Sequence, residues 1–264
     1  MASPATRFVF AILTFVTMGM IIGALLQLAY IRRLEDSYGT ESSLRRLSET
    51  RNGGGIQLIQ GISHWEDKEA LILRLGYECD HLREIAKPRL QVSTVVDTKT
   101  GKGIKSKVRT SSGMFLSNEE RKYPLIQAIE KRISVYSQVP AENGELIQVL
   151  RYEKNQFYRP HHDYFSDTFN LKSGGQRVAT MLMYLSDNVE GGETFFPQAG
   201  SGECSCGGKM VKGLCVKPNK GDAVLFWSMG LDGQSDPSSI HGGCEVLSGE
   251  KWSATKWMRQ QTFT

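Results

Sequence analysis

The segment RYEKNQFYRPHHDYF, residues 151–165, begins in a β-prone run, Leu146 to Tyr152, and contains a histidine and an aspartate two positions apart. Residues i and i+2 of a strand project to the same side, so we expect His161 and Asp163 to point together into the protein. His162 would then face away from Asp163, and we assign it a packing or substrate-side role. The segment therefore predicts a strand that presents paired side chains for chemistry.

The rest of the chain beyond Glu145 has the same character, with short β-prone runs separated by Gly, Asp, Asn and Pro clusters. Besides the first run, these are Arg177 to Leu185, Glu193 to Phe196, Ala223 to Trp227 and Trp252 to Met258. Upstream, apolar spacing predicts one helix over Asp67 to Ala86 and a second that starts at Pro124. We predict a mainly β fold with supporting helices (α+β), a sandwich or jelly roll.

Length and composition favour a single catalytic domain with appendages. The chain has 264 residues, of which 40% are hydrophobic, enough for one substantial core. Its 32 basic and 28 acidic residues are scattered along the sequence and give a net charge of +4. Because a nucleic-acid footprint needs clustered Lys and Arg, we expect no nucleic-acid partner. The sequence is compatible with an oligomer and specifies no oligomeric state.

The amino-terminal region predicts a membrane anchor. Residues 8–30 form an uncharged apolar stretch that is long enough to cross a bilayer as a helix, after a short tail at residues 1–7. A cleaved signal peptide is the alternative, but the stretch runs into Arg32 and Arg33 without a small-residue cleavage site. Residues 31–66 are polar and glycine-rich and predict a stem, which leaves 67–264 as the catalytic domain. Charges flank both ends of the span and do not settle its orientation.

Five cysteines occur: Cys79, Cys204, Cys206, Cys215 and Cys244. The odd number leaves at least one unpaired if the others form disulfides within the chain. The spacing of Cys204, Cys206 and Cys215 differs from the paired CxxC arrangement of a zinc site, and no fourth ligand lies nearby. A crosslinked or flexible glycine-rich surface loop fits this region better.

His161, Asp163 and the distant His241 form a candidate metal site. Two imidazoles and one carboxylate suit Fe(II) and leave three coordination positions open for a bidentate oxo-acid and dioxygen. Each residue has an ordinary explanation taken alone, such as a hydrogen-bonded core histidine. Lys251 follows His241 by ten positions and could anchor a buried carboxylate of the co-substrate. Together the four residues indicate an iron-dependent oxygenase.

Five longer motifs carry a family resemblance. They are RYEKNQFYRPHHDYF, GGQRVATMLMYLSD, EGGETFFP, KGDAVLFWS and SIHGGCEVLSGEKWSATKW. In this order, and over about Glu78 to Met258, the chain closely resembles the prolyl 4-hydroxylases of plants. The resemblance implies a double-stranded β-helix that hydroxylates peptidyl proline at C4, consuming 2-oxoglutarate and dioxygen and releasing succinate and carbon dioxide, with ascorbate keeping Fe(II) reduced.

The resemblance also assigns roles by position. It implies that His161, Asp163 and His241 bind the iron and that Lys251 pairs with the C5 carboxylate of 2-oxoglutarate. The same pocket would be lined by Tyr152, Thr194 and Trp257, and the peptide groove by Arg109, Glu145, Tyr158 and Arg177. The implied substrates are proline-rich polypeptides, extensin-like or arabinogalactan-type, of the secretory pathway and plant cell wall. We expect a single-pass type II protein of the endoplasmic reticulum or Golgi membrane with a lumenal catalytic domain.

One departure from the family concerns residues 77–78. Tyr77 passes directly into Glu78, where family members usually carry an extra segment that forms an early strand. Its loss would expose a sheet edge and destabilise the scaffold, as in a splice variant.

Three other functions remain open. The chain could hydroxylate another side chain or a small molecule, because the iron and co-substrate residues do not identify the oxidised carbon. It could be a catalytically impaired, membrane-tethered peptide-binding protein. A zinc hydrolase would leave Lys251 without a task.

Overall fold

The computed structural model describes residues 56–59, 68–97 and 99–263, which all fall within one compact unit. The predicted span at residues 8–30 and most of the predicted stem lie outside these residues. Within the described part of the chain, no helix combines the length and the apolar character that a membrane crossing requires.

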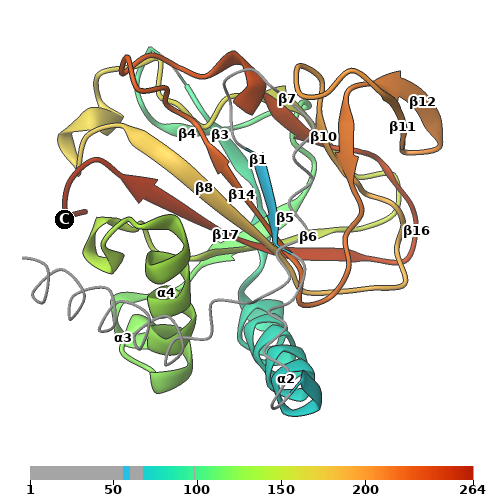
Figure 1. Cartoon of the computed structure of the whole chain (residues 1–264), viewed down its shortest axis with the longest axis horizontal. Helices are drawn as coiled ribbons and strands as arrows, with labels where there is room; N and C mark the ends of the chain where they lie inside the picture. The colour runs from blue at the N-terminus through green and yellow to red at the C-terminus, as the bar shows by residue number, and fades with distance from the viewer. Residues whose placement is uncertain (1–55, 60–67, 98, 264) are drawn as a thin grey trace, which may run out of the picture. The chain divides into compact units, whose positions relative to one another are not determined.

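Two antiparallel sheets form the body of this unit (Figure 1). The larger sheet has seven strands in the order β1-β14-β8-β17-β6-β5-β2, and the smaller has four in the order β13-β10-β15-β7. The strands of the larger sheet are β1 (Ile56–Ile59), β14 (Ala223–Trp227), β8 (Arg177–Tyr184), β17 (Lys251–Arg259), β6 (Gln148–Tyr152), β5 (Ser112–Phe115) and β2 (Gln91–Val92). Those of the smaller are β13 (Leu214–Val216), β10 (Thr194–Phe196), β15 (His241–Gly243) and β7 (Tyr158–His161). The jelly-roll prediction is confirmed.

The remaining strands of the described residues form three two-stranded sheets. They are β3 (Thr94–Val96) with β4 (Gly103–Lys105), β11 (Glu203–Cys206) with β12 (Lys209–Lys212), and β9 (Glu190–Gly191) with β16 (Val246–Ser248). Figure 1 shows the β11–β12 hairpin at the periphery of the smaller sheet.

Helices α2 (Lys68–Ala86), α3 (Asn118–Arg121) and α4 (Pro124–Ser137) lie on one side of the larger sheet (Figure 1). Helix α4 begins with a proline at its first turn and ends where Gln138 adopts a left-handed conformation, φ 57°. Apolar residues at helical spacing pack on the sheet, among them Cys79 and Leu82 of α2 and Ile129 of α4. Burying each such large side chain contributes about 1.5–3 kcal/mol, which holds the helices on the sheet.

A second apolar layer lies between the sheets. Every second residue of β8 and β14 faces inward, so Leu182, Tyr184 and Phe226 meet Phe196 of the smaller sheet. This layer forms one wall of the space that holds the candidate metal ligands.

The edge of the larger sheet beside β14 is paired. Strand β1 lies within the stretch predicted as stem and pairs with β14 from Ile56 opposite Phe226 to Ile59 opposite Ala223. A strand from before α2 thus protects the backbone groups of β14 that an open edge would leave unpaired.

Candidate metal centre and co-substrate pocket

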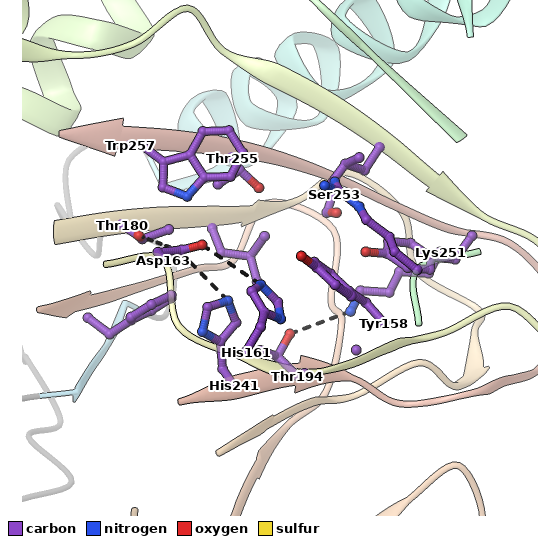
Figure 2. A pocket seen from close by; sticks show the side chains of 17 residues that line it. Tyr158, His161, Asp163, Thr180, Thr194, His241, Lys251, Ser253, Thr255 and Trp257 are labelled. Carbon is purple, nitrogen blue, oxygen red and sulfur yellow. Dashed lines mark hydrogen bonds and ion pairs between the residues drawn. The ribbon is translucent and has the colours of Figure 1, made fainter. Parts of the chain in front are cut away.

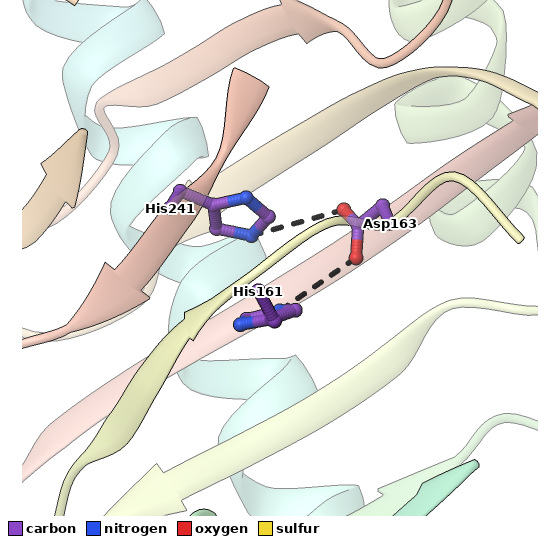
Figure 3. Close-up of side chains that lie close together, drawn as sticks. All are labelled: His161, Asp163 and His241. Carbon is purple, nitrogen blue, oxygen red and sulfur yellow. Dashed lines mark ion pairs between the residues drawn. The ribbon is translucent and has the colours of Figure 1, made fainter. Parts of the chain in front are cut away.

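The three predicted metal ligands lie close together, His161 and His241 on neighbouring strands of the smaller sheet and Asp163 just after β7 (Figure 3). His161 ends β7 and pairs across the sheet with His241, the first residue of β15. The Nε2 atom of His161 lies 3.8 Å from Oδ1 of Asp163, and that of His241 lies 3.8 Å from Oδ2. One ligand atom from each residue lies within 4.8 Å of the others. The strand register thus brings together residues 80 positions apart in the chain.

Each histidine is oriented by a backbone carbonyl. Nδ1 of His161 lies 3.0 Å from the oxygen of Arg159, and Nδ1 of His241 lies 2.9 Å from that of Ser239. Because a carbonyl only accepts, we assign the ring proton to Nδ1 in both residues. Each Nε2 then presents its lone pair toward Asp163, as a metal-bound imidazole requires.

The carboxylate of Asp163 is fixed by a hydroxyl that the sequence analysis did not single out. Oγ1 of Thr180, on β8, donates to Oδ2 of Asp163 over 2.7 Å. Burial raises the pKa of Asp163, but the two histidines, Arg177 and this hydrogen bond outweigh it and lower the pKa below its ordinary value. Burial, with a smaller contribution from His241, lowers the pKa of His161. Asp163 and His161 are therefore both held in the deprotonated form, which is the form that binds a cation.

A pocket between the sheets continues from the metal ligands to Lys251 (Figure 2). All four residues predicted for the co-substrate line it, namely Lys251, Tyr152, Thr194 and Trp257. Lys251 is 3% exposed, and its Nζ lies 3.5 Å from Oγ1 of Thr194. It makes no ion pair with any residue that the structure describes. A buried cation without a counter-ion is the complement of a carboxylate.

The charge of Lys251 is sensitive to its surroundings. Burial lowers its pKa to about 8, and the negative charge of Glu193 opposes that shift. A bound carboxylate would restore the charged form, because an opposite charge nearby favours ionisation. Binding of an acidic co-substrate and protonation of Lys251 are therefore coupled.

Tyr184 is buried and contacts residues that line the pocket, a role that the sequence analysis missed. Its hydroxyl donates to Oγ1 of Thr194 over 2.7 Å, and its ring centroid lies 5.7 Å from Nζ of Lys251. The signal was present, since Thr180, Leu182 and Tyr184 alternate along one predicted strand and therefore share a face. Ser253 and Thr255 of β17 are likewise two positions apart on one strand, and both line the pocket.

The four residues predicted for the peptide groove separate into two places. Arg109 and Tyr158 line the pocket, where the guanidinium carbon of Arg109 lies 4.8 Å from the ring centroid of Tyr158. Glu145 and Arg177 are not among the lining residues. Glu145 is buried and accepts hydrogen bonds from Arg177 over 2.7 and 2.9 Å and from Arg259 over 2.6 Å. Arg177 in turn lies 3.9 Å from Asp163, so this ion-pair network backs the metal site.

The cysteines form two disulfides, Cys204–Cys215 and Cys206–Cys244, and Cys79 is free and buried. This confirms a crosslinked loop with one unpaired cysteine.

His162 is exposed and turned away from the site, with Nδ1 3.4 Å from Oγ of Ser235.

Comparison with known proteins identifies this arrangement. The sequence model of the 2OG-Fe(II) oxygenase superfamily matches residues 147–259, which include all three metal ligands and Lys251. The chain is a 2-oxoglutarate-dependent Fe(II) dioxygenase. It is 67% identical to prolyl 4-hydroxylase 1 of Arabidopsis thaliana over 283 residues, covering 98% of this chain and 99% of that protein. The chain belongs to the prolyl 4-hydroxylase family.

Two further relatives agree with that assignment. Probable prolyl 4-hydroxylase 3 of Arabidopsis thaliana is 56% identical over 190 residues, covering 69% of this chain and 64% of that protein. A solved structure of the viral collagen prolyl hydroxylase of Paramecium Bursaria Chlorella virus-1, in complex with 2OG, is 26% identical with a TM-score of 0.54. That likeness covers 76% of this chain and 94% of the viral chain.

The residues present fit the metal and co-substrate of this family. The two nitrogens and one oxygen suit Fe(II) and leave coordination positions open. When bound, the iron supplies the oxidation of the substrate with dioxygen, and ascorbate is typical of the family. Among the chain's own residues, Thr180 orients Asp163 and Phe226 adds an apolar wall, while the cation of Lys251 beside Thr194 would be available to the far carboxylate of 2-oxoglutarate.

Proposed function

We propose that this chain hydroxylates proline at C4 in proline-rich secretory and cell-wall polypeptides, of extensin-like or arabinogalactan type. The observation that carries the proposal is the pocket that joins the His161, Asp163 and His241 cluster to the buried cation of Lys251. Its support is the 67% identity, over nearly the whole chain, to a protein named prolyl 4-hydroxylase 1.

Aromatic side chains beside the metal ligands support a peptide substrate. The ring of Tyr158 stacks on His161 with 3.7 Å between centroids, and Trp257 lines the pocket beside them. The indole Nε1 of Trp257 is buried and has no hydrogen-bond partner among the described residues. A polyproline II segment is already extended and has free carbonyls, so it can bind an aromatic-lined site with a low entropic cost.

The experiment is incubation of the purified protein with Fe(II), 2-oxoglutarate, ascorbate and a proline-rich peptide, followed by mass spectrometry. We expect hydroxyproline in peptides with extensin-like or arabinogalactan-type sequence and none in a peptide whose prolines are replaced by alanine. The Asp163→Ala variant is the matched control. Turnover of a free amino acid or small molecule in preference to every peptide would refute the peptide assignment.

A second candidate, a peptide-binding protein with impaired catalysis, follows from the junction at Tyr77–Glu78. The alignment to the Arabidopsis protein extends over 283 positions, more than the 264 residues of this chain, so that relative has residues without a counterpart here. Peptide binding without succinate release would favour this candidate. Comparing the melting temperature of this chain with that of a version that carries the extra segment between Tyr77 and Glu78 measures the cost to stability. Equal melting temperatures would show that the missing segment does not destabilise the domain.

We also propose that residues 8–30 anchor the chain in the endoplasmic reticulum or Golgi membrane with the catalytic domain in the lumen. Two disulfides support an oxidising compartment, because they are rare in the cytosol. Protease protection of the full chain in sealed microsomes tests this: the catalytic domain should resist protease until detergent is added. Digestion before detergent would contradict a lumenal domain.

A further inference from the structure

The β11–β12 hairpin is joined to the rest of the domain by two disulfides. Cys204–Cys215 connects β11 to β13 over a sequence separation of 11, and Cys206–Cys244 connects the end of β11 to the residue after β15 over a separation of 38. Among the strands that the structure describes, β11 and β12 pair only with each other, and most residues of this hairpin are exposed. It has little apolar burial to hold it in place, so the disulfides are its main attachment.

Cys244 directly follows the strand that carries the third metal ligand. Strand β15 has only three residues, His241, Gly242 and Gly243. A Cβ atom built on Gly243 would lie 3.8 Å from the ring of Tyr152 and 3.9 Å from Nζ of Lys251. The backbone of β15 is therefore a wall of the co-substrate pocket. Its position determines both where His241 lies and how much space remains beside Lys251.

Glu193 provides a second connection between the Cys206–Cys244 disulfide and the pocket. The amide of Gly207, next to Cys206, donates to the Glu193 carboxylate over 2.9 Å, and the amide of Cys244 donates to the Glu193 carbonyl over 2.8 Å. Glu193 precedes Thr194, the hydroxyl that lies beside Lys251. Both halves of the disulfide thus contact the start of β10, which pairs with β15.

We propose that the Cys206–Cys244 disulfide is a positioning element of the iron and co-substrate site. It fixes β15 and the start of β10 against each other, so its loss frees His241 and Thr194 to move apart. Cys244 is buried, but Cys206 is partly exposed and open to a thiol. A dithiol reductant would break the S–S bond, giving two thiols, and would itself become a disulfide in a balanced two-electron exchange.

The affinity for 2-oxoglutarate should therefore depend on the redox state of the Cys206–Cys244 disulfide. This proposal rests on the iron and co-substrate site of the proposed function and is independent of which peptide is hydroxylated. The C206S/C244S variant should bind 2-oxoglutarate about 10- to 100-fold more weakly than the parent in the presence of Fe(II) without oxygen. The readout is the charge-transfer absorbance of the ternary complex. C204S/C215S is the matched control, because it removes a disulfide of the same hairpin that is not attached to β15, and its affinity should stay near that of the parent.

Hydrogen exchange gives a readout that needs neither metal nor turnover. In metal-free protein, amides in residues 193–196 and 239–246 should exchange faster in C206S/C244S than in C204S/C215S, while α4 and β8 remain equally protected. If C206S/C244S does not fold, mild reduction of folded C204S/C215S, which retains Cys206–Cys244, supplies the same comparison before and after reduction. Unchanged affinity and unchanged exchange after loss of Cys206–Cys244 would overturn the proposal. Weakened 2-oxoglutarate binding and faster exchange in C206S/C244S, together with no hydroxylation of any proline-rich peptide by the parent, would support this proposal and count only against the proposed function.

Discussion

Replacing Lys251 tests the co-substrate end of the pocket. Lys251→Met keeps the length and most of the volume of a side chain that is 3% exposed, but removes its charge. A carboxylate of 2-oxoglutarate would then be buried without a partner, because Thr194 and Tyr184 supply only hydroxyls. Breaking a buried ion pair in this way costs about 3–5 kcal/mol. The KM for 2-oxoglutarate should rise by roughly two to three and a half orders of magnitude, while the KM for the peptide changes little.

The pH dependence of the parent sharpens this test. Burial lowers the pKa of Lys251 to about 8, and a carboxylate of the co-substrate would favour its protonated form. Affinity for 2-oxoglutarate should therefore be constant well below this pKa and fall by about tenfold per pH unit above it. Lys251→Arg keeps its charge at every accessible pH, so its KM, although raised by the larger side chain, should lose this dependence. Steady-state kinetics with varied 2-oxoglutarate at each pH gives both results. A KM in Lys251→Met close to that of the parent, or a flat profile in the parent, would refute the reasoning.

Three further changes test the supports of the metal. Thr180→Val removes the hydrogen bond to Asp163 and should weaken iron binding about 10- to 100-fold, with Thr180→Ser restoring it, as measured by metal titration. Gly242→Ala would place a Cβ 2.8 Å from the carbonyl oxygen of Tyr158, so β15 and β7 should separate and metal binding should fail; Gly243→Ala, with no contact under 3.7 Å, is its control. Arg177 and Arg259 outweigh burial and lower the pKa of Glu145, so its contribution to stability is present above the unfolded carboxyl pKa and is lost as the pH falls through the folded pKa. Thermal melts should show a smaller acid-induced loss in Glu145→Gln than in the parent, and equal losses would contradict this role.

Much of the fold could be read from the sequence because local signals and tertiary packing agree. Helix α4 begins at the proline that predicted it, and β14 has the bounds of its apolar run. The strands that were missed are short or polar. Strand β15 contains two glycines, β11 is held by disulfides, and the β11–β12 hairpin is mostly exposed, so none of these three strands shows hydrophobic alternation.

The metal ligands were predictable because their spacing is local or their chemistry is specific. The ion-pair network of Glu145, Arg177 and Arg259 was not, since three segments far apart in the chain meet there. The contacts of Thr180 and Tyr184 likewise depend on which strand of the sheet faces which ligand, and this is set by strand order rather than by any local pattern.

The most direct test of the account is the metal content of the folded protein. After anaerobic loading with Fe(II) and removal of free metal, the parent should retain a single ferrous ion per chain. His161→Ala, Asp163→Ala and His241→Ala should each lose it while keeping the circular dichroism of the parent. Full retention of iron by any one of these folded variants would contradict the claim that the three side chains share one ion.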